Sequence, residues 1–232
     1  VYVPAKRGSL QPFMVAAVRK RGLLPYVRAR EGLVPLIEEL KSGKPVLVLQ
    51  NLGLAQLPNW HYAVVVGWEP SSQTFILRSG KNPEQKRSLK FFEYTWRASG
   101  YWAMTVYSPD ETPVRPQLQP WLQAAAGLEG ASQWQAALEV YRAIEQQFPN
   151  EFLAVMGQGN VAYQLQRYSD AEMAYRKALT LTDKPYGPAH NLAWALIRQN
   201  KLNAAKKFAK QAKTLGGSAY QSAWDALNQQ DM

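Results

Sequence analysis

NWHYAVVVGWEPSSQTFILRSG, residues 59–80, organises the first half of this chain. Residues 60–68 are apolar, β-branched and too few for a typical helix, so they predict a strand. Residues 69–73 form a turn cluster, and residues 74–79 predict the returning strand of a hairpin. If the hairpin closes around that turn, Ser79 lies opposite Ala63 and diagonal to His61, on the same face of the sheet. An imidazole so placed is half of an acid–base site.

The composition limits the kinds of site that this chain can hold. Its 232 residues suit one large domain or two small ones. No apolar run reaches the roughly 18–20 residues that cross a bilayer. Zero cysteines exclude disulfides and thiolate metal sites, and two isolated histidines argue against a histidine-rich metal site. We therefore predict no metal, no cofactor and no transmembrane segment. The chain opens on Val1 without a visible signal peptide, so we expect its natural N-terminus to lie upstream.

The formal net charge is +10, and most of the excess lies in the first half. Residues 1–112 carry 15 Lys and Arg against 8 Asp and Glu, and residues 113–232 carry 12 against 9. No nucleic-acid motif accompanies this charge, so we interpret it as a basic soluble surface and expect no nucleic-acid partner. Binding to nucleic acid or anionic lipid remains the alternative.

Helical and extended patterns surround the hairpin. We predict helices over residues 10–21 (capped by Ser9), 33–41 and 88–97, strands over 24–29, 45–50 and 101–107, and a polar loop over 81–87. Residues 1–107 then form an α+β domain. The segment that follows, SPDETPVRPQLQP, contains four prolines and no periodicity, so residues 108–117 predict an interdomain linker.

From residue 118 onward the sequence repeats with a period of 34 residues. Five columns of apolar or small residues carry the repeat: Trp134, Tyr168 and Leu202; Ala137, Ala171 and Ala205; Tyr141, Tyr175 and Ala209; Ile144, Ala178 and Ala212; Ala125, Gly159 and Ala193. This is the tetratricopeptide period, in which each repeat is a pair of helices. We predict an all-α array over 118–232, with repeats at 118–151, 152–185 and 186–219 and a capping helix at 218–230.

Four segments of residues 1–107 resemble the papain-like bacteriocin-processing cysteine peptidases, which cleave double-glycine leaders. They are GSLQPFMVAAVRKRGLLPYV, SGKPVLVLQN, HYAVVVGWEP and TFILRSG. Together with the repeats, they make the chain similar to a bacterial group of such peptidases that carry C-terminal tetratricopeptide repeats. The resemblance implies a papain-like fold that is incomplete at its N-terminus, because the family's cysteine segment would lie upstream of Val1.

The resemblance also implies catalytic residues and a location. His61 matches the family's histidine, and Ser79 stands where the family has an aspartate. A hydroxyl can orient an imidazole but brings no charge to stabilise an imidazolium. Gln50 or Asn51 are alternative partners for the ring, and a strand-end role without chemistry is the alternative for both His61 and Ser79. Members of this group imply an extracytoplasmic location, in the periplasm or at the outer membrane, often as lipoproteins.

The repeats predict a second site, because tetratricopeptide arrays bind extended peptides along their first helices. The matching positions are Met156, Asn160, Tyr163, His190, Asn191, Trp194 and Arg198. Asn160 and Asn191 stand where a carboxylate clamp has its asparagines, but Met156 replaces a clamp lysine. Both asparagines also belong to the general repeat consensus, and Tyr163 and Trp194 also suit core packing.

Two main functions follow from these patterns. The first is a cysteine peptidase whose repeats recruit a peptide, an unfolded protein or a protein partner, with this chain lacking the nucleophile. The second is a catalytically inactive peptidase-like domain that binds peptides or secretion partners. A structural scaffold that uses only the repeats is a third, which leaves His61 unexplained.

Overall fold

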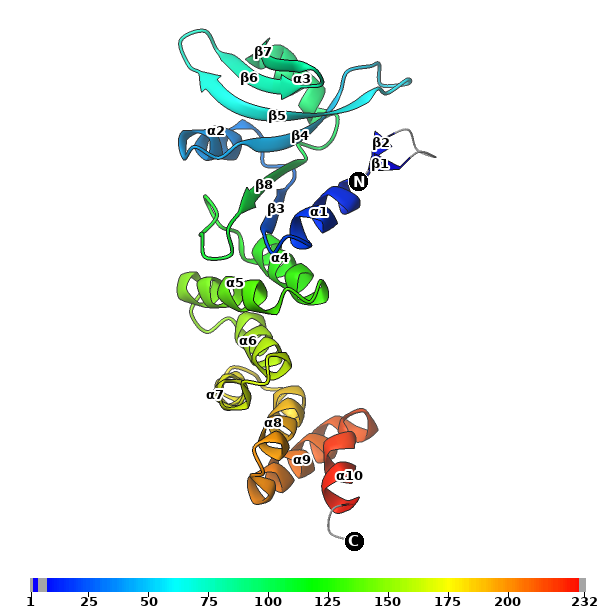
Figure 1. Ribbon diagram of the computed structural model, residues 1–232, viewed down its shortest axis with the longest axis vertical. Helices are drawn as coiled ribbons and strands as arrows, with labels where there is room; N and C mark the ends of the chain where they lie inside the picture. The colour runs from blue at the N-terminus through cyan, green and yellow to red at the C-terminus, as the bar shows by residue number, and fades with distance from the viewer. Residues whose placement is uncertain (1, 4–7, 230–232) are drawn as a thin grey trace. The chain divides into compact units, whose positions relative to one another are not determined.

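The computed structural model describes residues 2–3 and 8–229, and the chain divides into two compact units, Val1–Ala124 and Ala125–Met232. The division falls inside a helix, α4 (Leu118–Gly130), rather than at the end of the proline-rich segment. Residue 230, the expected end of the capping helix, lies outside the described residues. Figure 1 shows the course of the chain.

A six-stranded antiparallel sheet forms the frame of the first unit, with strand order β3-β8-β4-β5-β6-β7. The strands are β3 (Leu24–Arg28), β4 (Val46–Asn51), β5 (Trp60–Glu69), β6 (Thr74–Ser79), β7 (Asn82–Ser88) and β8 (Ala103–Tyr107). A separate two-stranded sheet pairs β1 (Tyr2–Val3) with β2 (Gly8–Ser9). The predicted hairpin is therefore β5 and β6, with β4 on its other side.

Two helices cover one face of this sheet. Side chains of α2 (Leu33–Lys41) and α3 (Leu89–Arg97) share a buried cluster with alternate residues of β4, β5 and β6. The fully buried side chains Val48, Val65, Phe75 and Phe92 belong to it. A further helix, α1 (Gln11–Arg19), packs on β3. The alternation of buried and half-buried residues along β4 and β6 is the period of two that strands require.

Two local predictions are wrong. A polar loop was predicted over residues 81–87, but residues 82–87 belong to β7, which pairs with β6 from Thr74–Ser88 to Ser79–Asn82. A polar edge strand lacks the alternation of apolar residues by which a strand is recognised in a sequence. Its charges disfavour pairing with the strands of other chains. Ser9 does not cap the first helix, because the N-cap is Leu10 and no side-chain cap bond forms.

This architecture also corrects the predicted fold class of the first unit. An incomplete papain-like peptidase domain was expected, whereas the structure has a six-stranded antiparallel sheet with helices on it, and no peptidase fold is indicated. The sheet extends beyond the hairpin because β7 satisfies the edge hydrogen bonds of β6. The α+β arrangement of layers occurs in proteins of many functions, so it does not by itself indicate a peptidase.

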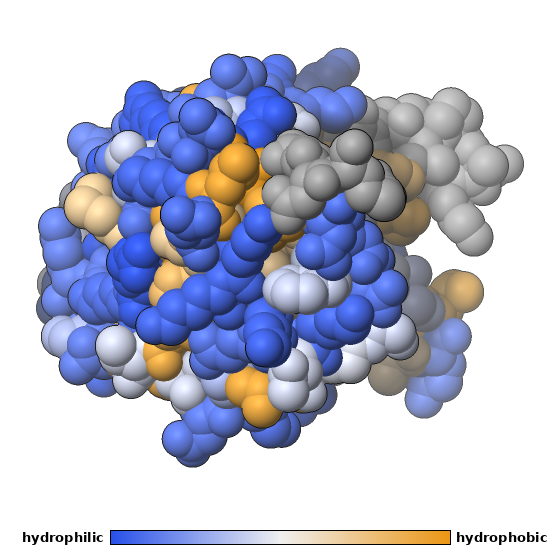
Figure 2. Space-filling model, turned by 90° about the horizontal axis from the view of Figure 1, so that it is seen from below, coloured by the Kyte–Doolittle hydropathy of each residue, from blue (hydrophilic) through white to orange (hydrophobic). Residues whose placement is uncertain are grey.

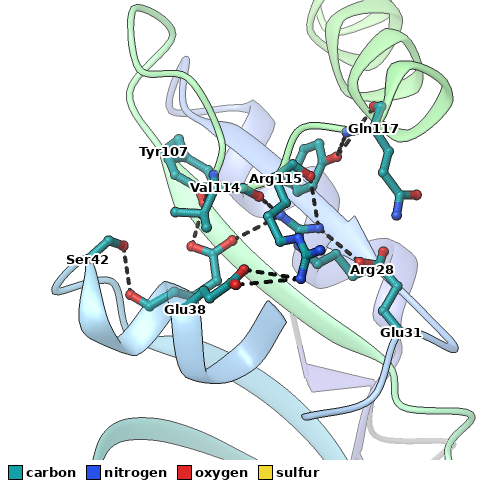
Figure 3. Close-up of polar contacts among 10 residues, drawn as sticks. Arg28, Glu31, Glu38, Ser42, Tyr107, Val114, Arg115 and Gln117 are labelled. Carbon is teal, nitrogen blue, oxygen red and sulfur yellow. Dashed lines mark hydrogen bonds and ion pairs between the residues drawn. The ribbon is translucent and has the colours of Figure 1, made fainter. Parts of the chain in front are cut away.

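The proline-rich segment is bound to the first unit along its length (Figure 3). We call residues 108–117 the strap. The buried Arg28 guanidinium donates to the strap carbonyls of Val114 and Arg115, and the Tyr26 hydroxyl accepts from the Gln117 N–H at 2.7 Å. The Tyr107 hydroxyl accepts from the Val114 N–H at 3.0 Å. These hydrogen bonds satisfy backbone groups of the strap that are not paired in a β-sheet.

A buried carboxylate completes this network. Glu39, 1% exposed, pairs with Arg28 at 3.3 Å and accepts from the Tyr107 hydroxyl. Burial raises the pKa of the Glu39 carboxyl, and the bonds from Tyr107 and Arg28 oppose that rise. Arg28 also pairs with Glu31 at 3.0 Å, as Figure 3 shows. Because both charges are buried, removing either one would leave the other uncompensated and would destabilise the fold.

The second unit is built from paired helices, as the 34-residue period predicts. After α4 come α5 (Trp134–Gln147), α6 (Phe152–Gln164), α7 (Tyr168–Leu179), α8 (Tyr186–Arg198), α9 (Leu202–Gly216), a short 3-10 turn (Gly217–Tyr220) and α10 (Ser222–Gln229). Each helix from α5 to α8 packs on the next in chain order, and α10 covers α9. Ala223 and Leu227 of α10 join the buried core of the last repeats, as a capping helix should.

The repeat columns are the contacts between these helices. Every alanine in the columns is fully buried. Gly157 and Gly159 allow the closest approach: a Cβ at these positions would lie 2.4 Å from the ring of Tyr141 and 2.5 Å from the ring of Tyr175, respectively. The small residues are therefore required by the aromatic rings that pack on them.

Candidate functional site

His61 and Ser79 meet as the hairpin register requires. Val64 pairs with Arg78 across β5 and β6. Ser79 follows Arg78 and lies diagonal to His61, three residues before Val64, and Ser79 Oγ is 2.7 Å from His61 Nε2. The register shift between Val65 and Gly67 sets this alignment. Pairing continued from Glu69–Thr74 without that shift would place Ser79 opposite Val64, on the other face of the sheet from His61. Both side chains are half-buried.

His61 lines an open cleft of about 890 Å³, and Ser79 contacts its ring from β6. Residues of α1, β4, β5 and the segment after α3 line the cleft, among them Gln11, Leu49, Trp60, Tyr62 and Ser99. Neither alternative partner reaches the ring: Gln50 donates to Thr95 Oγ1 at 2.7 Å, and Asn51 Oδ1 accepts from the backbone of Gly53 and Asn59. Asn51 thus shapes the loop that leads into β5.

The cleft holds one oriented imidazole and a hydroxyl. A histidine can move a proton for a nucleophile, but the chain contains no cysteine. Catalytic roles for His61 and Ser79 remain a prediction that the geometry alone does not test.

A second cavity, of about 560 Å³, lies among the repeats. Its walls come from α4, α6, α7 and α8: Glu129, Asn160, Tyr163, Gln164, Tyr175, Asn191 and Trp194. We call it the repeat groove. Four of the seven predicted binding residues line it, namely Asn160, Tyr163, Asn191 and Trp194.

Two asparagines of successive repeats are joined at the floor of the repeat groove. Asn160 Oδ1 accepts from Asn191 Nδ2 at 3.1 Å and from the Tyr175 hydroxyl at 3.0 Å. Burial raises the pKa of Tyr175, so its hydroxyl stays a neutral donor. These bonds fix the orientation of both amides, which still have donors and acceptors to offer a ligand.

The other predicted residues lie around the groove rather than in its wall. Arg198 donates to the Tyr168 hydroxyl at 2.9 and 3.0 Å, and Tyr168 packs edge-on against Tyr163. His190 contacts Tyr220 through Nδ1 and its ring, and burial lowers its pKa. Met156 is half-buried against the core of the last repeats.

Sequence reasoning missed three residues of the groove: Glu129, Gln164 and Tyr175. Tyr175 stands in a repeat column and was counted only as core. Glu129 and Gln164 lie at the ends of their helices, where the repeat period has no column to mark them.

The described residues hold no group of three or more His, Cys, Asp or Glu side chains that could bind a metal ion. In the same part of the chain, no helix combines the length and apolarity that a membrane span needs.

No protein-family model matches the chain, and no curated protein matches it. Among solved structures, the chain is similar to SycD, the type III secretion translocator chaperone of Yersinia enterocolitica, with 16% identity, a TM-score of 0.47 and coverage of 50% of this chain and 86% of SycD. It is also similar to YrrB, a TPR protein with an unusual peptide-binding site, with 21% identity, a TM-score of 0.41 and coverage of 43% and 51%.

A putative C39-like peptidase from Bacillus anthracis also aligns, with 17% identity, a TM-score of 0.32 and coverage of 36% of this chain and 50% of that one. The chain therefore spans only about half the length of YrrB and of this protein. At these identities and TM-scores, no likeness assigns a function to this chain.

These findings correct the prediction that the chain belongs to the bacteriocin-processing cysteine peptidases and is a hydrolase. The neighbours that align over the larger share of the chain are helical repeat proteins, and no peptidase family model matches. The physical reason is that the first unit is a six-stranded antiparallel sheet with helices on it, an arrangement that does not by itself specify a peptidase. The second unit is built from helical repeats.

Proposed function

We propose that this chain is a non-catalytic binding protein whose repeat groove holds an extended segment of a peptide or protein partner. The Asn160–Asn191 pair carries the proposal. Asparagines one repeat apart can each bond to the backbone of an extended chain, which offers donors and acceptors at regular spacing. Such contacts bind a segment whatever its side chains are.

The walls of the groove suit the side chains of such a segment. Tyr163 and Trp194 flank the amides, and both are half-buried, so each presents part of a ring to the cavity. Aromatic rings give a large contact area at small cost in side-chain entropy. A groove with rigid amides on its floor and rings at its side is typical of a binding site rather than of a packed core.

The test compares Asn191→Ala with Asn203→Ala. Asn191 lines the groove and donates to Asn160, whereas Asn203 is exposed on α9 outside the groove. A randomised decapeptide library on a solid support is probed with each purified full-length variant. We expect Asn191→Ala to weaken binding about tenfold, because a bound backbone loses its amide partner, and Asn203→Ala to bind as the parent does.

Two results would contradict the proposal. One is no binding of any library member by the parent protein. The other is equal binding by both variants, which would place the ligand outside the repeat groove.

A further inference from the structure

We propose that the repeat groove recognises a cationic side chain, lysine or arginine, of the bound segment, through Glu129 and the aromatic rings around it. This inference rests on the proposed function, since it names the chemistry of the peptide that the groove takes.

Glu129 is the only charged residue among those lining the repeat groove. It lies near the end of α4 and is half-buried. The Tyr141 hydroxyl donates to Glu129 Oε2 at 2.9 Å, which fixes the carboxylate. Within the described residues, Glu129 has no ion pair with a lysine or arginine, and Oε1 has no hydrogen-bond donor, so its negative charge has no counter-charge in the groove.

Arg198, a predicted binding residue next to the groove, has its own partner. Arg198 donates two hydrogen bonds to Tyr168, and its guanidinium lies 5.2 Å from the centre of that ring. The other carboxylates of the second unit with recorded cationic partners, Glu145 and Glu172, pair with Lys177 and with Arg176 and Lys201. Glu129 differs from them because its partner in this chain is a neutral hydroxyl.

The rest of the lining is suited to a cation. Three aromatic residues, Tyr163, Tyr175 and Trp194, line the same cavity as the carboxylate. The face of an aromatic ring attracts an ammonium or guanidinium group, and an adjacent carboxylate adds a charge-assisted hydrogen bond. The amide oxygens of Gln164 and Asn191 contribute further acceptors.

The same lining argues against the carboxylate clamp that the asparagine positions resemble. A bound carboxylate needs a cationic partner, and no lysine or arginine lines the groove. A peptide C-terminus would also lie beside the Glu129 charge, which is repulsive in a partly desolvated cavity. Figure 2 shows one face of the molecule, on which apolar residues form small groups among hydrophilic ones.

Four sets of N-acetylated, C-amidated random decapeptides test the proposal, with lysine, arginine, norleucine or glutamate fixed at the central position. We expect the full-length protein to bind the lysine and arginine sets about tenfold more tightly than the norleucine set, as one charge-assisted contact would give, and the glutamate set most weakly. In Glu129→Gln, most of the preference for lysine and arginine over norleucine should be lost, because the Tyr141 bond survives, the charge does not, and only the rings still favour a cation.

The matched control is Glu139→Gln, which removes a carboxylate of α5 that bonds to Gln135 and lies outside the groove. It should keep the preference for cations. If the parent binds the norleucine set as tightly as the lysine set, or if Glu129→Gln keeps the preference, the cation inference fails while peptide binding stands. If no set binds, the proposed function fails with it.

Discussion

At the scale of single residues, two glycines of the repeats tolerate no larger side chain. Gly157 and Gly159 lie on one helix, α6, and each faces the ring of a tyrosine from a neighbouring helix. Glycine inside a helix costs about 1 kcal/mol relative to alanine. The cost is offset because Tyr141 and Tyr175 fill the space and point their hydroxyls at Glu129 and Asn160, two residues of the groove.

Gly159→Ala should destabilise the second unit by about 1–3 kcal/mol, because the new Cβ would lie 2.5 Å from the Tyr175 ring, which is 2% exposed. Gly187→Ala is the matched control: it also lies in a helix, and no atom lies within 4 Å of the added Cβ. That variant should gain about 0.5–1 kcal/mol. Urea unfolding measures both, and equal stabilities would show that α6 can move away from Tyr175.

At the scale of elements, the strap shows how irregular backbone becomes part of a domain. Proline-rich segments have few N–H donors and cannot join a ladder. Here three side chains that reach from the sheet, Tyr26, Arg28 and Tyr107, supply the missing partners. Two ion pairs on the surface, Lys44–Glu111 and Arg115–Glu38, add to these bonds and should contribute little, since both are solvent-exposed.

Arg28→Met should destabilise the first unit by about 3–5 kcal/mol, because it leaves the Glu39 carboxylate buried without its counter-charge. It should also speed proteolytic cleavage within residues 108–117, whose carbonyls lose their donor. The double variant Arg28→Met/Glu39→Met should recover part of the stability, since no buried charge remains. A double variant as unstable as the single one would show that the strap bonds matter more than the ion pair.

At the scale of the whole molecule, two units with separate cores should unfold in separate steps. Each unit has its own buried cluster, one between the sheet and its helices and one along the repeats. Two-state behaviour holds within a cooperative unit and fails across independent ones. Scanning calorimetry should therefore show two transitions, of which Gly159→Ala lowers one and Arg28→Met the other. A single transition that both variants lower equally would contradict this independence.

A ligand of the repeat groove provides a further check on the same scale. Binding to the folded state of the second unit raises the transition of that unit alone, by mass action. A library peptide that raised both transitions equally would bind elsewhere or couple the units.

The repeats were predictable because their information is local and periodic. A 34-residue spacing of small and aromatic residues identifies paired helices, and the buried alanines of α5, α7 and α9 lie where that spacing places them. The two strands β5 and β6 were predictable for a similar reason, because a turn separates two alternating segments. The meeting of Ser79 with His61 also depends on the register shift between Val65 and Gly67, which the sequence pattern does not show.

Only the tertiary structure decided the rest, because it depends on partners that are far away in the sequence. β7 is a strand because β6 has an open edge beside it, and the strap is ordered because Arg28 lies under it. Glu129 became a residue of the groove when α4, α6, α7 and α8 brought a carboxylate, three amides and three rings to one cavity. Periodicity predicts which face of a helix is buried. The role of a charged residue at the end of a helix depends on the neighbours that the tertiary structure places around it.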